Sequence, residues 1–433
     1  MSDAGATLLA RLARRGVALA ELFEKQGSSR MFARGAEGES VHYAVESGWA
    51  VRAGDGEHSW FRAGSGGVAE TLEPGPATPQ PLRLPEPAPP RAAPPSRLDA
   101  PLASEAEGMS LLAGVARELA RELPGAQLGS ARLDDGVSEF RLRSSRGIDA
   151  RVRARSTLLR VEATAGPRRL AAEFLARAAG ELKPLALARR LADRLLALAG
   201  ESSVPAAGSS LLLAAPVVAR LVEALAPRLV GGAAGRALVE RLGEAPRLGS
   251  ELATLVDDGS DPAGVLAAPF DGEGVPSAPA RLVVAGVFER PLVAWWEAGA
   301  SPATGCSRRV GWRDLPRRAP TQLRLEPEPR VTVADLVEQG GASAYLVAAE
   351  GGIRIDAVGR FALPVSGFAL AGGRGAGALG RCLLRGEVEG WMRGLEAVAR
   401  DLTYVPGDGL YGAPSAVVSG FELVAAAADP TAG

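Results

Sequence analysis

The residue types in this sequence that could support metal chemistry are sparse. The only two histidines, His42 and His58, both lie within the first sixty residues, and they cannot occupy positions i and i+4 of one helix. Zinc sites usually draw on several His, Cys or carboxylate ligands at recognisable spacing. The sequence therefore argues against a metal site of the usual kind in this chain.

Two cysteines, Cys306 and Cys382, could act as nucleophiles. Neither has a histidine in its own half of the sequence to serve as a base, so a buried or half-buried thiol is the favoured interpretation and a cysteine peptidase the alternative. The cysteines form no CxxC pair and no disulfide framework, which is typical of a reducing compartment. We expect a cytoplasmic protein.

Two further patterns suggest ligands but lack the necessary context. Residues 375–380 match GxGxxG, yet a dinucleotide site also needs a preceding buried strand, a following helix and a later acidic residue, so we expect a glycine-rich loop. Asp257, Asp258 and Asp261 lack the spacing of a calcium-binding loop, and a polar turn explains them equally well. Spacing alone therefore reveals no active site.

The composition sets the class of protein. At 433 residues the chain exceeds the usual size of one hydrophobic core, which predicts two domains. Apolar residues at 47% and charged residues at 23% are typical of a soluble globular protein, and a net charge of −1 favours neither nucleic acid nor a membrane as partner. Residues 1–26 carry charges throughout, which predicts neither a signal peptide nor a spanning helix.

The first domain, residues 1–207, is expected to mix helices with an antiparallel sheet. The clearest element is a hairpin over 139–155, with its turn at 144–147, because apolar and charged residues alternate on both sides of the turn. Its arginine-rich face could bind nucleic acid, but it lacks interleaved aromatic residues, so a solvated face is favoured. Other expected elements are helices at 7–25, 109–123, 168–182 and 185–199, and short strands at 30–33, 40–45 and 49–53.

A proline-rich insertion interrupts this domain at about residues 65–107. Eleven prolines fall between Pro74 and Pro101, with few large apolar residues among them. Such a segment is expected to be extended or disordered rather than packed. Its PxxP patterns could dock a partner, but a passive linker is the favoured interpretation.

The second domain, residues 208–433, is expected to be largely antiparallel β structure, which makes the whole chain α+β. Helical patterns over 217–242 are followed by short strands separated by Gly and Pro turns. The predicted strands are 210–213, 281–287, 322–325, 344–348, 353–358 and 415–424. Thr332 and Asp335 form a capping box, which predicts that one further helix begins here and interrupts the run of strands.

The second domain resembles the TldD/PmbA family, once called modulators of DNA gyrase. Its Asp-Asp-Gly-Ser run at 257–260, Phe-Asp-Gly-Glu-Gly-Val-Pro at 270–276 and Thr-Gly-Cys-Ser-Arg-Arg at 304–309 are similar to family motifs. The segments 320–323, 359–369 and 412–415 are also similar to family motifs. The family-motif positions are Asp258, Phe270, Asp271, Glu273, Gly274, Gly305, Gly367 and Pro414.

In the metal-bearing subunit of this family, a helix carries HExxxH and a C-terminal cysteine completes the site. The matching helix here reads Val222-Glu223-Ala224-Leu225-Ala226-Pro227, so both histidine positions are apolar, and 400–414 contains no cysteine. Glu223 is left as a vestige that we expect to be solvated or salt-bridged, since no metal-bound water remains for it to deprotonate. The resemblance implies no catalytic residue and no cofactor in this chain.

The resemblance further implies a subunit of the PmbA (TldE) type, a pseudoenzyme paired with a TldD-type chain that holds zinc or iron. Such a heteromeric metallopeptidase would act on unfolded peptides held in an extended form. The alternative is a stand-alone peptide-binding or regulatory protein with a degenerate protease fold.

Overall fold

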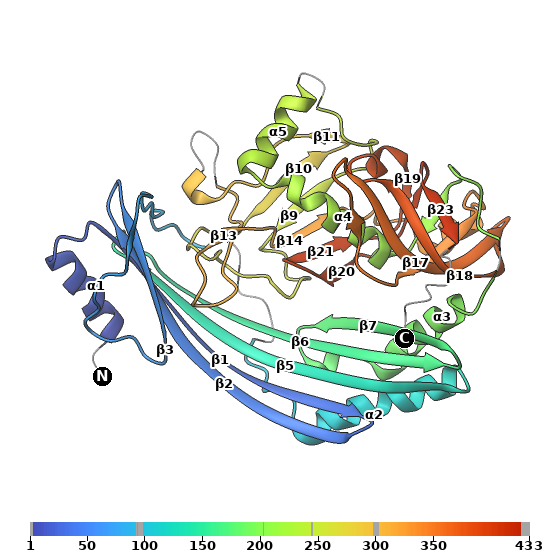
Figure 1. Ribbon diagram of the computed structural model, residues 1–433, viewed down its shortest axis with the longest axis horizontal. Helices are drawn as coiled ribbons and strands as arrows, with labels where there is room; N and C mark the ends of the chain where they lie inside the picture. Colours follow the sequence, from blue (N-terminus) through green and yellow to red (C-terminus); the bar gives the residue numbers. More distant parts are fainter. Residues whose placement is uncertain are drawn as a thin grey trace.

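The computed structural model consists of a long, curved N-terminal sheet with a β-rich C-terminal part lying against its concave side (Figure 1). The structure describes residues 3–91, 93, 98–201, 203–243, 246–297 and 303–425. None of the helices within these ranges is long and apolar enough to cross a membrane.

The N-terminal sheet has the strand order β4-β3-β2-β1-β5-β6-β7, with every neighbouring pair antiparallel. The predicted hairpin is confirmed, and its strands are longer than expected. The strands are β1 (Leu19–Gly35), β2 (Gly38–Gly54), β3 (Ser59–Ser65), β4 (Ala77–Thr78), β5 (Ala126–Ser144), β6 (Asp149–Ala165) and β7 (Arg168–Ala176). The three short strands expected before residue 54 are parts of the long strands β1 and β2.

The helix expected over residues 7–25 is wrong in its second half. Helix α1 (Ala4–Arg14) ends early, and β1 begins at Leu19. Leu22 packs beneath α1, whereas its neighbour Phe23 packs against Trp312 of the C-terminal part. Because both faces of β1 are buried here, consecutive apolar residues replace the alternation that marks a half-exposed strand.

The helix expected over residues 168–182 is also wrong, because residues 168–176 form strand β7. Leu170, Ala172 and Ala176 alternate toward the core, and the strand pairs with β6 along its whole length. Helices α2 (Glu105–Glu122) and α3 (Pro184–Ala197) match the other two predicted helices of this half. They share one core with the sheet (Figure 1).

The described part of the proline-rich segment is extended, as expected, but it packs against the protein. Leu82 and Leu84 are buried, and the backbone at Ala100 and Ala103 binds the buried pair Arg155 and Asp135. The predicted disorder is therefore wrong for these residues, because a few leucines and backbone groups suffice to attach an extended chain. Residues 92 and 94–97 of the segment lie outside the described residues.

In the C-terminal part, helix α4 (Ala215–Leu229) packs between two sheets, followed by α5 (Gly232–Leu242). One sheet has the order β11-β10-β9-β14-β21-β20, and the other β19-β22-β8-β15-β17-β18-β23 with β16 beside β17. The fold is α+β, as predicted, and pairing is antiparallel except between β14 and β21 and between β8 and β15.

Strands β8, β10, β14 and β15 match predicted strands, whereas the strand predicted over 353–358 is only the two-residue β16, that over 415–424 is two strands, and the long strands β17 and β18 were not predicted. The strands are β8 (Leu211–Leu213), β9 (Leu255–Asp258), β10 (Pro279–Val284), β11 (Val287–Phe288), β12 (Ser307–Arg308), β13 (Arg317–Arg318), β14 (Gln322–Leu325), β15 (Ala344–Ala349), β16 (Arg354–Ile355), β17 (Arg360–Ala371), β18 (Arg374–Glu387), β19 (Leu395–Val398), β20 (Thr403–Pro406), β21 (Leu410–Ala413), β22 (Ala416–Val418) and β23 (Glu422–Ala425). Thr332 and Asp335 form the predicted capping box at the start of α6 (Val333–Glu338). The GxGxxG run is not a loop but part of β18, where Gly377 and Gly380 have positive φ at irregularities in the pairing with β17.

Candidate functional site: a chamber between two sheet edges

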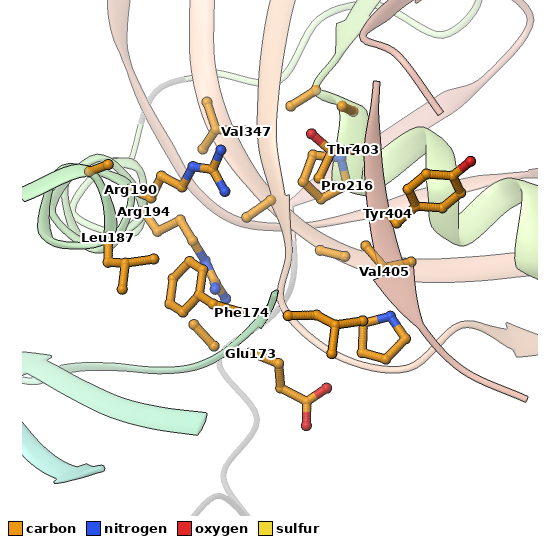
Figure 2. Close-up of a pocket in the computed structure, with 18 of the residues that line it drawn as sticks. Glu173, Phe174, Leu187, Arg190, Arg194, Pro216, Val347, Thr403, Tyr404 and Val405 are labelled. Carbon is orange, nitrogen blue, oxygen red and sulfur yellow. The ribbon is translucent and has the colours of Figure 1, made fainter. Parts of the chain in front are cut away.

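A cavity of about 1360 Å³ lies between the N-terminal sheet and the C-terminal part. Strand β7 and helix α3 contribute its N-terminal walls, and β15, β20 and the start of α4 contribute the others. Figure 2 shows side chains from all of these elements converging on one space. We call this cavity the chamber.

Two edge strands line the chamber. Strand β7 is the last strand of the N-terminal sheet and β20 the last strand of the sheet that contains β9 and β14, and both lie along the cavity. An edge strand offers unpaired N–H and C=O groups that can hydrogen-bond to an added strand. The chamber therefore exposes two strand edges whose backbone groups are of the kind that can pair with an added strand.

Individual contacts show which backbone groups of the two edges face away from their own sheets. On β7, the carbonyl of Ala171 accepts a hydrogen bond from Arg194 Nη2 at 2.9 Å. Because every second residue of an antiparallel strand turns its backbone the same way, Glu173 and Leu175 also present their N–H and C=O groups outward. On β20, the Pro406 carbonyl accepts from Arg220 at 3.1 Å, which places the backbone of Tyr404 on the open side.

A charged network fixes the wall between α3 and β15. Arg194 Nη2 donates to Glu350 Oε2 at 2.8 Å, and Ser366 Oγ donates to Glu350 Oε1 at 2.6 Å. The Glu350 side chain is almost fully buried, so each of its oxygens is satisfied by a partner. This network holds Arg194 against β7.

The start of α4 closes the chamber on the C-terminal side. The backbone N–H of Ala215 donates to Ser415 Oγ at 3.0 Å, and Ser415 in turn donates to Asp401 from its hydroxyl at 2.7 Å and its N–H at 2.8 Å. Pro414, a family-motif position, directly precedes this serine. The motif therefore positions a helix start that lines the chamber.

Helix α4 offers no metal ligands at Val222 and Pro227, the two positions that the family resemblance aligns with histidines. Val222 is completely buried in the core, and Pro227 lies inside the helix. Glu223 forms an ion pair with Arg220 at 2.6 Å, as predicted. Among the described residues there is no cluster of three His, Cys, Asp or Glu side chains that could hold a metal ion, so the residues present do not fit the metal of the family.

Most family-motif residues lie outside the chamber, at a contact between the N-terminal sheet and the C-terminal part that we call the joint. Glu273 Oε1 accepts from Arg52 Nη2 at 2.9 Å, and Arg52 also donates to Glu21 at 2.7 Å. Arg309 donates to Glu21 as well and lies 4.8 Å from the ring centre of Phe23. Two strands of the sheet are thus attached to two loops of the C-terminal part by buried ion pairs.

The remaining motif residues shape the loops of the joint. Asp271 accepts three backbone hydrogen bonds, from Glu273, Val275 and Ser307, at 2.9 to 3.0 Å. Gly274 has φ +82 and faces Ile148 and Leu142, the partly buried Phe270 joins the same apolar cluster, and Gly305 has φ +70 beside the Pro276 carbonyl. These positions select glycine because other residues are strained at positive φ.

Burial alters the pKa values of the carboxyl groups at and near the joint. It raises the pKa of Asp271 to about 6 despite its hydrogen bonds, and that of Glu273 to about 7 despite Arg52. For Glu21, burial is outweighed by Arg309 and Arg52, so its pKa is lowered. The surroundings therefore disfavour the charged form of Glu273 and favour that of Glu21.

The other site residues predicted from the sequence take part in local hydrogen bonding and packing. Asp258 accepts a hydrogen bond from the N–H of Ser260 in a polar turn, and buried Asp257 accepts from the N–H groups of Thr321 and Gln322. Gly367 faces the Tyr345 carbonyl so closely that an added Cβ would lie 2.2 Å from it. Cys306 and Cys382 are both completely buried.

The sequence motifs thus contain residues of the joint, but no motif predicted either the joint or the chamber. Arg190, Arg194, Glu350, Tyr404 and the edge of β7 belong to no motif that we recognised. The signal that could have located the chamber is the alternation of Leu170, Ala172 and Ala176, because it predicts a strand where we assigned a helix.

The fold is shared with proteins of solved structure. TldE from Thermococcus kodakarensis aligns with a TM-score of 0.83 and 16% identity, over 97% of this chain and 100% of that chain. A putative modulator of a DNA gyrase from Thermotoga maritima aligns with a TM-score of 0.79 and 16% identity, covering 98% and 99% of the two chains. A third structure, a putative modulator of DNA gyrase from Bacteroides thetaiotaomicron, aligns with a TM-score of 0.71 and 15% identity, over 98% of this chain and 100% of that chain.

The family follows from the C-terminal part. Residues 209–425 match the family described as PmbA/TldA metallopeptidase C-terminal domain, and the chain belongs to this PmbA/TldD family, as the sequence motifs predicted. A comparison with curated protein sequences found no match.

Proposed function

We propose that this chain is the non-catalytic subunit of a heteromeric metallopeptidase that processes unfolded peptides. The observation that carries the proposal is the composition of α4 beside the chamber. At the two positions that the family resemblance aligns with histidines of metal-bearing subunits, this helix has the core residue Val222 and Pro227, and the chamber lies beside the start of the helix. A chain with such a space but without ligands at those positions is suited to binding rather than to bond cleavage.

In this proposal the partner is a TldD-type chain that contributes the zinc or iron and the catalytic groups. The present chain would supply part of the peptide chamber and stabilise the partner. The backbones of Glu173, Leu175 and Tyr404 would hydrogen-bond to an extended substrate, which is how sheet edges bind peptides regardless of side-chain sequence. This mode of binding favours unfolded peptides, because a folded protein has few free backbone groups. We place this activity in the cytoplasm.

The test compares this chain alone with this chain co-expressed with a TldD-type chain that carries HExxxH. We expect a stable complex, and both metal and peptidase activity only in that complex. The Glu223→Gln variant is expected to leave the activity of the complex unchanged, since Glu223 is paired with Arg220. Stoichiometric metal in the isolated chain, or chelator-resistant peptidase activity from it, would contradict the proposal.

The second candidate function is a stand-alone peptide-binding or regulatory protein. It is favoured by one observation, namely that both edge strands along the chamber, β7 and β20, belong to this chain, so pairing with a peptide needs no second chain. Purification from the native host separates the two functions. A TldD-type chain recovered in equal amount supports the heteromeric peptidase, and recovery of the present chain without it supports the stand-alone protein.

A further inference from the structure

One arginine that lines the chamber has no hydrogen-bond or ion-pair partner among the residues that the structure describes. Arg190 projects from α3 into the cavity, one helical turn before Arg194 (Figure 2). Within the part of the chain that the structure describes, Arg190 forms no hydrogen bond and no ion pair. The other basic side chains that line the chamber all have protein partners: Arg177, Lys183, Arg194 and Arg220.

The acidic side chains around the chamber do not neutralise Arg190. Glu350 is held by Arg194 and Ser366, Asp401 by Ser415, and Glu173 by Arg160 outside the cavity. Burial raises the pKa of Asp193, the next acidic residue on α3; Glu122 adds to this effect and Arg189 opposes it. A positive charge therefore remains available to a ligand in the chamber.

The position of Arg190 relates this charge to the edge of β7. Residues four apart on a helix lie on the same face, so Arg190 and Arg194 are neighbours. Arg194 already reaches the Ala171 carbonyl on the edge of β7. A peptide that pairs with this edge would therefore pass within reach of the Arg190 guanidinium, whose fork of donors suits a carboxylate.

We propose that Arg190 binds a carboxylate of the extended peptide held in the chamber, either the C-terminal carboxylate or an Asp or Glu side chain. This inference rests on the proposed peptide-binding function and adds a preference for acidic or C-terminal segments. Backbone pairing accepts any sequence, and the arginine fixes where along the edge the peptide sits.

The test measures binding to the full chain by fluorescence anisotropy. The probe is an N-terminally labelled hexapeptide of alternating Thr and Val, with either a free or an amidated C-terminus. A third probe is amidated and carries one internal Glu. The variant Arg190→Gln is compared with Arg189→Gln, a matched control on the same helix whose side chain donates to Glu122 at 3.3 Å and does not line the chamber.

We expect Arg190→Gln to weaken binding of the free-acid peptide, or of the internal-Glu peptide, by about ten- to a hundredfold, as for loss of a charged hydrogen bond. Amidation of a peptide whose terminus is bound should have the same effect, and the two changes should not add. Dependence on the free terminus assigns a C-terminal carboxylate, and dependence on the internal Glu assigns a side chain. Equal affinity of wild type and Arg190→Gln for all three probes would overturn the inference.

Failure of this inference can be distinguished from failure of the proposed function. The Arg190→Gln chain should still co-purify with a TldD-type chain as the wild type does, because the substitution lies inside the chamber. Unchanged peptide binding with an intact complex would reject the role of Arg190 alone. Absence of any complex with the wild-type chain would reject the proposed subunit function, whatever the peptides do.

Discussion

Arg52 and Glu273 lie 221 positions apart in the sequence and form a buried ion pair of 2.9 Å. Arg52 comes from β2 of the N-terminal sheet and Glu273 from a loop of the C-terminal part. With Glu21 and Arg309 they make a buried group of two carboxyl groups and two guanidinium groups. Since β7 and β20 belong to the two parts that the joint connects, it also fixes the two edges of the chamber relative to each other.

Replacing Glu21 with glutamine should destabilise the protein strongly. Glu21 is 1% exposed and accepts hydrogen bonds from both Arg52 and Arg309, so its loss leaves Arg309 buried without a carboxylate partner. Breaking a buried ion pair from one side costs about 3–5 kcal/mol. Urea denaturation measures the change, with the exposed Glu39→Gln as control, whose pair with Arg34 should contribute less than about 1 kcal/mol. Equal stability of both variants would contradict a central role of Glu21.

The joint should also make stability depend on pH through Glu273. Its pKa is raised from 4.5 to about 7 by burial, so between these values the folded chain binds a proton that the unfolded chain has released. The free energy of unfolding therefore falls as pH rises from about 4.5 to 7, and this contribution is constant above 7.

The variant Glu273→Gln isolates this effect, because it removes the titrating group and keeps the shape. We expect wild type to lose about 2–4 kcal/mol relative to the variant between pH 4.5 and 7. Urea denaturation at four pH values across this window measures the difference. Asp271 titrates in both proteins, so its contribution to the free energy of unfolding cancels to first order in the difference between them. A difference that does not change with pH would mean that Arg52 keeps Glu273 ionised throughout.

Two buried aspartates should respond differently to the same substitution. Asp271 uses both carboxylate oxygens, accepting from Glu273 and Val275 at Oδ1 and from Ser307 at Oδ2. In Asp271→Asn the amide NH2 cannot accept the third bond, which should cost about 1–3 kcal/mol. Asp257 accepts both of its backbone bonds at Oδ1, which an asparagine oxygen can replace, so Asp257→Asn should cost less than about 1 kcal/mol. Thermal unfolding of the two variants tests this order, and a reversed order would be inconsistent with it.

These residues show what the sequence could and could not predict. The run at 270–276, together with the other motifs, predicted the family, and the helix and strand patterns predicted the α+β fold. The run could not reveal that Glu273 meets Arg52, because that contact depends on how the two parts pack. Because a helix was predicted over 168–182, β7 was not recognised as an edge strand. Leu, Ala, Glu and Arg favour helices, and only tertiary pairing overrides that preference. The chamber was missed for this reason.

Gly367 should not tolerate even one added carbon. A Cβ there would lie 2.2 Å from the Tyr345 carbonyl and 2.8 Å from the Leu346 Cα, and both are backbone atoms of the paired strand β15. Gly367→Ala should therefore destabilise the protein by about 1–3 kcal/mol. Gly129→Ala is the matched control within a strand, because its nearest neighbour would be 3.8 Å away. A wild-type melting temperature for Gly367→Ala would show that β15 and β17 can separate at little cost.

The two cysteines should be unreactive in the native protein. Both are completely buried, and burial raises the pKa of Cys306 to about 12 and also raises that of Cys382, whereas alkylation requires an accessible thiolate. At pH 8, iodoacetamide should therefore modify neither residue, as measured by mass spectrometry, and should modify both in concentrated guanidinium chloride. Rapid native labelling of either cysteine, together with loss of peptidase activity, would instead support a cysteine peptidase, because only an exposed, low-pKa thiol can serve as its nucleophile.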